Sequence, residues 1–136
     1  MMDLDGFKTL NDKYGHQAGD LVLVAVARSV MSHLRPYDEF FRYGGDEFLV
    51  VTPATDQETG YGAVERLREQ IASMDFDVGD GRSVQVTASF GVTVLDAEAT
   101  VEESIGRADR ALYAAKAAGR NQSRIWYASM SEAPDH

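Results

Sequence analysis

The chain has 136 residues, of which 44% are hydrophobic and 26% charged, and this composition predicts one globular domain with a sizeable core. The absence of cysteine excludes disulfides and thiolate metal sites, and the absence of a long apolar run or leader segment predicts a cytoplasmic location without membrane contact. The formal net charge of −9 argues against nucleic-acid binding, which usually needs a basic face.

The hydrophobic pattern predicts strands and helices in alternation along the chain. Strands are expected at residues 1–5, 38–42, 47–52, 84–94 and 124–127, and helices at residues 7–14, 19–34, 61–74 and 101–118. Residues 77–82, rich in Asp and Gly, are expected to form a loop or hairpin tip, and Gly119 to end the last helix. We therefore expect a domain over residues 1–128, followed by a polar, frayed tail over residues 129–136.

This order is an elaborated β-α-β-β-α-β pattern, which predicts an α+β, ferredoxin-like fold with a mostly antiparallel central sheet flanked by helices. In that arrangement the first strand lies antiparallel to the second strand of the hairpin. The acids Asp3 and Asp5, at the end of the first strand, would then lie beside Asp46 and Glu47.

Asp46 and Glu47 follow two glycines between apolar, aromatic-rich runs, which is typical of a tight hairpin. Gly44 and Gly45 are expected to take positive φ in the turn. Carboxylates at the mouth of such a hairpin suit Mg²⁺, which prefers oxygen ligands and shares its shell with substrate phosphates. Clustered acids repel one another unless a cation neutralises them, so convergence of Asp3 with Asp46 implies a divalent ion. Taken alone, each acid pair is more often a pair of solvated surface carboxylates than a metal site.

Other residues are candidates for holding a nucleotide. The residues that open the first helix, Phe7 and Lys8, could bind phosphate through backbone N–H groups and the ammonium. Asn11 with Asp20 could recognise the edge of guanine, although Asp20 could instead cap the long helix. These spacings indicate phosphoryl transfer without specifying the reaction.

Lys116 and Arg120 lie four residues apart on or just past the last predicted helix, so they are expected to share a face. Two cations on one face could clamp a triphosphate. The alternative is that they only complement the negative end of the helix dipole.

Six stretches of the chain together resemble the GGDEF family of diguanylate cyclases, which join two GTP into cyclic di-GMP. The matching stretches are residues 3–12, 14–20, 42–48, 87–91, 108–116 and 119–121, and they span nearly the whole chain in the family's order. The resemblance implies a nucleotidyl-cyclase palm fold and a homodimer in which each subunit binds one GTP. It also implies that the first strand is truncated here, and that the chain was trimmed from a longer parent with a sensor domain.

The resemblance also implies a role for each matching residue. Mg²⁺, with Mn²⁺ as the alternative, would be bound by Asp3, the carbonyl of Leu4 and Asp46, with Glu47 in support. Asp46 would also accept the proton of the attacking 3′-hydroxyl. The remaining matches would hold GTP: phosphates at Phe7, Lys8, Lys116 and Arg120, guanine at Asn11 and Asp20, and close backbone approach at Gly44 and Gly45.

Arg35 and Asp38 stand upstream of the hairpin at the spacing of the family's inhibitory site, where the product binds. Arginine suits the O6/N7 edge of guanine and a phosphate, and aspartate suits the opposite edge. Arg66 is the expected second arm of this site, whereas Arg-x-x-Asp alone is usually a surface ion pair. Two functions remain open at this point: an active cyclase with product inhibition, or a non-catalytic module that binds GTP or cyclic di-GMP as a receptor. A protein-interaction scaffold is a weaker third.

Overall fold

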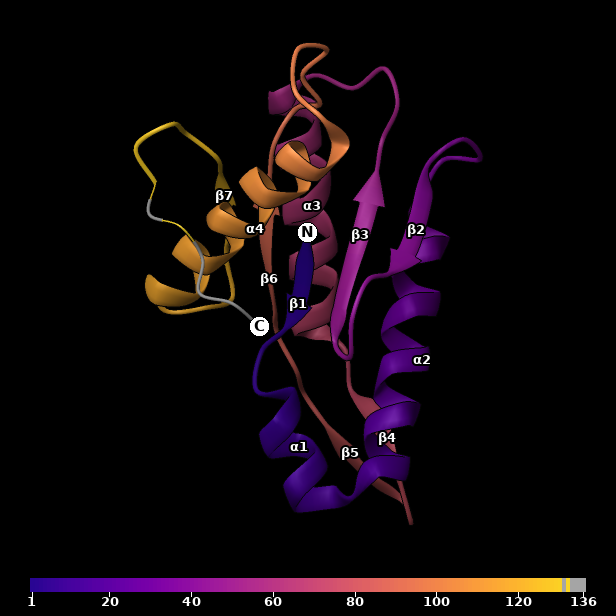
Figure 1. Cartoon of the computed structure of the whole chain (residues 1–136). Helices are drawn as coiled ribbons and strands as arrows, with labels where there is room; N and C mark the ends of the chain where they lie inside the picture. The colour runs from indigo at the N-terminus through magenta and orange to yellow at the C-terminus, as the bar shows by residue number, and fades with distance from the viewer. Residues whose placement is uncertain (131, 133–136) are drawn as a thin grey trace.

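The computed structural model describes residues 1–130 and residue 132. It contains a five-stranded sheet, a separate two-stranded hairpin and four helices within these residues (Figure 1). The strands are β1 (Met2–Leu4), β2 (Glu39–Arg42), β3 (Glu47–Val51), β4 (Phe76–Gly79), β5 (Arg82–Val84), β6 (Ala88–Val92) and β7 (Ser123–Ile125). The helices are α1 (Phe7–Tyr14), α2 (His16–Ser32), α3 (Gln57–Ser73) and α4 (Val101–Ala117).

The short strand β1 lies in the middle of the main sheet, whose order is β2-β3-β1-β6-β7 (Figure 1). It pairs antiparallel with β3 on one side and with β6 on the other, while β6 and β7 run parallel. The predicted α+β fold with a mostly antiparallel sheet flanked by helices is therefore confirmed. Because β1 is central, its end lies between β3 and β6, which place Glu47 and Ser89 on either side of Asp3.

The sheet is covered on both faces. On one face, β1, β3 and β6 share a core with α1, α2 and α3, in which Met2, Val26 and Ile71 are fully buried. On the other face, Ala108 and Leu112 of α4 pack with Leu49 of β3. Because Phe48 and Leu49 join different clusters, β3 shows the alternation of faces that a strand buried on both sides requires.

Two helices begin earlier than predicted, for local reasons. Gly15, with φ 91°, donates its N–H to the Asn11 carbonyl and ends α1, so α2 starts directly at His16. Asp56 caps α3 by accepting from the Thr59 N–H at 2.8 Å, so this helix starts at Gln57.

The predicted single strand over residues 84–94 is wrong. Val84 ends β5, which pairs with β4, residues 85–87 belong to no strand, and β6 in the main sheet begins at Ala88. The alternation of apolar residues continues through the junction because Val86 and Ala88 are buried on either side of it. The hairpin tip expected near residues 77–82 is confirmed, with Asp80 and Gly81 at positive φ.

The end of the chain is described only in part. Of the tail predicted over residues 129–136, residues 131 and 133–136 lie outside the described residues. No helix within residues 1–130 is long and apolar enough to cross a bilayer.

Candidate active site

The two acidic segments meet at one end of the sheet, as the sequence predicts. In the β1–β3 register Asp3 lies opposite Glu47, and the Leu4 N–H donates to the Asp46 carbonyl at 3.2 Å. Antiparallel pairing thus brings the end of β1 to the start of β3. Residues more than forty positions apart in the chain form one acidic cluster.

Asp3 is the acid of this cluster whose pKa is shifted most, and its side chain is only 6% exposed. Burial, followed by the neighbouring Asp46 carboxyl, raises the pKa of Asp3 well above its usual range. Lys116 of α4 opposes this shift through an ion pair with Asp3 Oδ2. Asp3 Oδ1 is buried and accepts no hydrogen bond from the described residues. A buried carboxylate that keeps an oxygen without a hydrogen bond and has another carboxyl nearby suits a divalent cation.

The described residues contain no group of three or more His, Asp or Glu side chains arranged to hold a metal ion by themselves. The predicted ligand set does not require one. Mg²⁺ is commonly bound through one or two carboxylates together with waters and substrate phosphates. Asp3 and Asp46, with the backbone of Leu4 beside them, match that pattern.

The turn before Asp46 differs from the expected one. Neither Gly44 nor Gly45 is among the glycines at positive φ. The turn spans four residues between β2 and β3, and it is held by the N–H groups of Tyr43 and Gly44, which both donate to the Glu47 carbonyl. The Arg42 guanidinium also donates to the carbonyls of both glycines. This longer loop does not need the left-handed conformation of a two-residue turn. A Cβ built at Gly45 would meet no described atom within 4 Å. The space beside the Gly45 backbone is therefore open to a ligand.

The candidate guanine residues are brought together by the α1–α2 corner. A Cβ at Gly19 would overlap Asn11 Oδ1 and lie 3.1 Å from Phe7 Cζ, so both side chains pack against the Gly19 backbone. Asn11 Oδ1 is buried and has no hydrogen-bond partner in the described part of the chain. Asp20 is exposed in the second turn of α2, and since that helix begins at His16, the alternative in which Asp20 caps it is wrong.

At the end of α4, the two predicted cations lie in different surroundings. Lys116 reaches the acidic cluster directly, which a role restricted to the helix dipole would not require. Arg120 lies beyond the helix, which ends at Ala117, and its φ of 63° is left-handed. Arg120 therefore lies just past the helix, and whether its side chain shares a face with Lys116 stays a prediction. The tertiary position of the turn, and not helical periodicity, sets the direction of Arg120.

The Arg35–Asp38 pair is a compact hydrogen-bonded unit. Arg35 Nη2 lies 3.0 Å from Asp38 Oδ1, and its guanidinium also donates to Thr55 Oγ1 at 2.7 Å. The hydrogen bonds from Arg35 lower the pKa of Asp38, and the guanidinium lies over the Tyr37 ring at 4.5 Å. Arg66 is exposed on α3 and forms no ion pair with any residue in the described ranges. Its place in a shared site stays a prediction.

Sequence reasoning missed the surroundings of Asp5. Both of its carboxylate oxygens accept hydrogen bonds: Oδ2 from Thr87 Oγ1 at 2.7 Å and from the Asn121 N–H at 3.0 Å, and Oδ1 from Ser89 Oγ at 2.8 Å. Asp5 therefore connects the end of β1 to β6 and to the α4–β7 turn. It also lies at the edge of the acidic cluster. The hydroxyls at positions 87 and 89 were the only signal in the sequence.

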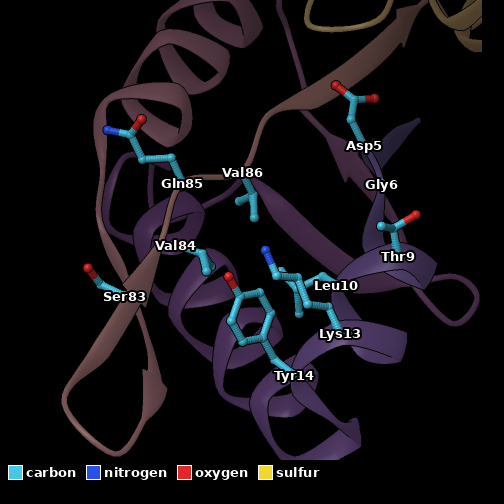
Figure 2. Close-up of a pocket in the computed structure, with 10 residues that line it drawn as sticks. All are labelled: Asp5, Gly6, Thr9, Leu10, Lys13, Tyr14, Ser83, Val84, Gln85 and Val86. Carbon is cyan, nitrogen blue, oxygen red and sulfur yellow. The ribbon is translucent and has the colours of Figure 1, made fainter.

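A shallow pocket of about 390 Å³ lies between α1 and β5, next to the candidate site. Figure 2 shows Lys13 and Tyr14 of α1 on one side of it and Val84 of β5 on the other, whereas the Asp5 carboxylate points away from them. Neither Asp3 nor Asp46 lines this pocket, so it is distinct from the acidic cluster.

Comparison with known proteins identifies relatives over nearly the whole chain. A family model described as "Diguanylate cyclase, GGDEF domain" matches residues 1–122. The chain is 42% identical over 125 residues to diguanylate cyclase DgcP of Pseudomonas aeruginosa. The aligned region covers 92% of this chain but only 18% of the length of that relative. Among solved structures, the active GGEEF domain of a diguanylate cyclase from Vibrio cholerae matches with a TM-score of 0.85 and 32% identity, covering 94% of this chain and 81% of that one. The GGDEF domain of DgcB from Caulobacter crescentus, solved in complex with c-di-GMP, matches with a TM-score of 0.86 and 31% identity, covering 91% and 74%.

Proposed function

The chain belongs to the GGDEF domain family of diguanylate cyclases, and from this we propose that it condenses two GTP into cyclic di-GMP and releases pyrophosphate. The observation that best supports this activity is the meeting of Asp3, Asp46 and Lys116 at the end of β1. Two acids and one cation lie beside the β2–β3 turn, where no described side chain covers the Gly45 backbone. This arrangement suits a nucleotide with its metal ion. A receptor for cyclic di-GMP would not require a buried Asp3 beside a second, partly exposed acid, Asp46.

Each subunit would hold one GTP. Asn11 and Asp20 would bind guanine, because a buried amide oxygen without a partner and a nearby carboxylate suit the N–H donors on one edge of that base. Phe7 and Lys8, at the start of α1, would hold phosphates together with Lys116 and Arg120. The first turn of α1 supports this role because no side chain caps its N–H groups.

In the reaction, the 3′-hydroxyl oxygen of one GTP attacks the α-phosphorus of the other. The bond from that phosphorus to the pyrophosphate oxygen breaks, pyrophosphate leaves, and Asp46 takes the hydroxyl proton. Bound Mg²⁺ or Mn²⁺, held by Asp3, the Leu4 carbonyl and Asp46 with support from Glu47, would lower the pKa of the hydroxyl and offset charge on the phosphate. The same step repeated in the opposite sense closes the ring.

The two nucleotides must be bound by two subunits that face each other, because one chain supplies one set of binding residues. Alignment of the two reactants can contribute roughly 7–11 kcal/mol of barrier reduction. The homodimer would thus be part of the catalytic device.

We also propose that the product inhibits the enzyme at Arg35 and Asp38, with Arg66 as a second arm. The Arg35 guanidinium is already oriented by Asp38 and Thr55, which accept from its Nε and Nη2, so its Nη1 donors would be presented to a ligand with little further ordering.

The test is to incubate the domain, alone and fused to a dimeric coiled coil, with GTP and Mg²⁺ and to measure cyclic di-GMP and pyrophosphate. We expect synthesis by the fused dimer, loss of synthesis in Asp46→Asn, and unchanged synthesis in Asp75→Asn, where an exposed acid is replaced. Tight binding of cyclic di-GMP without any turnover in the fused dimer would refute the cyclase and support the receptor.

A further inference from the structure

The turn that carries Arg120 has a backbone that needs external support. Gly119, Arg120 and Asn121 all have positive φ, at 121°, 63° and 47°. A left-handed conformation costs roughly 1–2 kcal/mol for a residue with a Cβ, so two such residues in succession persist only if contacts hold them.

Asp5 supplies one of those contacts from the turn that directly follows β1, the central strand of the sheet. Its Oδ2 accepts from the Asn121 N–H at 3.0 Å and from Thr87 Oγ1 at 2.7 Å. Its own N–H donates to the Thr87 carbonyl at 2.9 Å, so the backbone that carries this carboxylate is also held. A hydrogen bond to a charged acceptor is about twice as strong as a neutral one.

The opposite side of the turn is held by α3. Arg68 Nη1 donates to Asn121 Oδ1 at 2.8 Å, and Arg68 is itself paired with Glu65. Asn121 is therefore bound from the sheet through its backbone and from α3 through its side chain. Arg120 stands between this anchor and the end of α4.

Asp5 is unsuited to binding a metal ion or nucleotide itself. Its two oxygens accept three hydrogen bonds, and Figure 2 shows its carboxylate turned away from the side chains that face the neighbouring pocket. Yet it lies two residues after Asp3, so it connects the acidic cluster directly to the turn after α4.

We propose that Asp5 is a positioning residue for the triphosphate. It fixes the Gly119–Asn121 turn against the end of β1, and this fixes Arg120 relative to Asp3 and Asp46. This inference rests on the proposed function, since it takes Arg120 to bind the terminal phosphates. Asp5 acts through Arg120 and does not touch the nucleotide.

The first test measures binding by calorimetry with Mg²⁺, using GMP and a GTP analogue whose α–β bridge is methylene. We expect Asp5→Ala to weaken binding of the triphosphate analogue about 10- to 100-fold, as loss of a charge-assisted contact would, while GMP binding changes by less than about 3-fold. Asp5→Asn keeps the shape and one acceptor oxygen, so it should recover most of the difference. Arg120→Ala should show the same selective loss.

The double variant Asp5→Ala/Arg120→Ala separates positioning from general damage. If Asp5 acts through Arg120, the double variant binds the analogue no more weakly than Arg120→Ala alone. Losses that multiply, or an equal loss of GMP binding in Asp5→Ala, would overturn the inference.

The second test does not depend on nucleotide binding, and so separates this inference from the proposed function. Amide hydrogen exchange at Asn121, followed by NMR, should be at least about 10-fold faster in Asp5→Ala than in wild type. If Asp5→Ala does not fold, Asp5→Asn takes its place, with a smaller acceleration expected. An unchanged exchange rate at Asn121 would overturn the anchoring role, whereas a wild type that fails to bind the analogue would refute only the proposed function.

Discussion

Gly91 of β6 is the position at which the structure makes the sharpest stability prediction. A Cβ added there would lie 3.0 Å from Leu112 Cα and well inside van der Waals contact with the Ala108 carbonyl oxygen and the Leu112 N–H nitrogen. These are backbone atoms of α4, so no side chain can rotate away. The helix would have to retreat by about 1 Å from the sheet to restore ordinary contact distances.

We expect Gly91→Ala to lower the free energy of unfolding by about 3 kcal/mol, the upper part of the usual range for overpacking, because two rigid elements must separate. For a domain of this size that corresponds to a melting temperature lower by roughly 10 °C. Because α4 carries Lys116, its displacement should also loosen the ion pair with Asp3 and weaken GTP binding.

Urea unfolding followed by circular dichroism measures the effect. Gly106→Ala is the matched control, because Gly106 lies inside α4 and a Cβ there would meet no described atom within 4 Å. That variant should gain up to about 1 kcal/mol from helix propensity. A Gly91→Ala domain as stable as wild type would show that α4 does not pack on β6 as closely as described.

Three further predictions concern binding and pH. Gly19→Ala should displace Asn11 and weaken GTP binding by roughly 10-fold in calorimetry, the scale of a lost buried hydrogen bond; Gly60→Ala, whose Cβ would meet only Thr55 Cγ2 at 3.7 Å, should bind as wild type does. Arg35→Ala should keep cyclic di-GMP synthesis but lose product inhibition, and an unchanged inhibition curve would remove this residue from the inhibitory site. The pKa of Asp38 is lowered chiefly by its hydrogen bond from Arg35, so the stability it contributes is present above the usual aspartate pKa and disappears as the pH falls through the lowered value. Asp38→Asn should therefore be less stable than wild type at neutral pH and equal to it in strong acid, by urea titration at each pH.

Local sequence determined most of the secondary structure. The α1 and α4 helices and the β2–β3 hairpin lie close to their predicted bounds, because hydrophobic periodicity and the Gly119 signal are short-range features. The same information predicted that β1 would pair antiparallel with β3, which brings Asp3 to Asp46. Strand order in a small α+β fold is restricted enough for this inference to hold.

Where the chain changes its partner, local sequence was insufficient. The alternation through residues 84–94 continues across a transfer from the β4–β5 hairpin to the main sheet, so periodicity could not reveal the break. Helical spacing likewise cannot place Arg120, which follows the end of α4 at Ala117. The Gly44 and Gly45 backbones depend on how a four-residue loop is held by Arg42, which spacing alone does not specify.

The sequence by itself determined which chemistry the chain carries: its acids, its cations and the strands and helices that bear them. The tertiary structure decided which of these groups are adjacent and which are already engaged. Asp3 and Asp5 look alike in the sequence, yet one is a buried carboxylate beside Asp46 and the other is fully hydrogen-bonded to β6 and the turn after α4. That difference arises from contacts between residues more than forty positions apart, and only the folded chain brings those residues together.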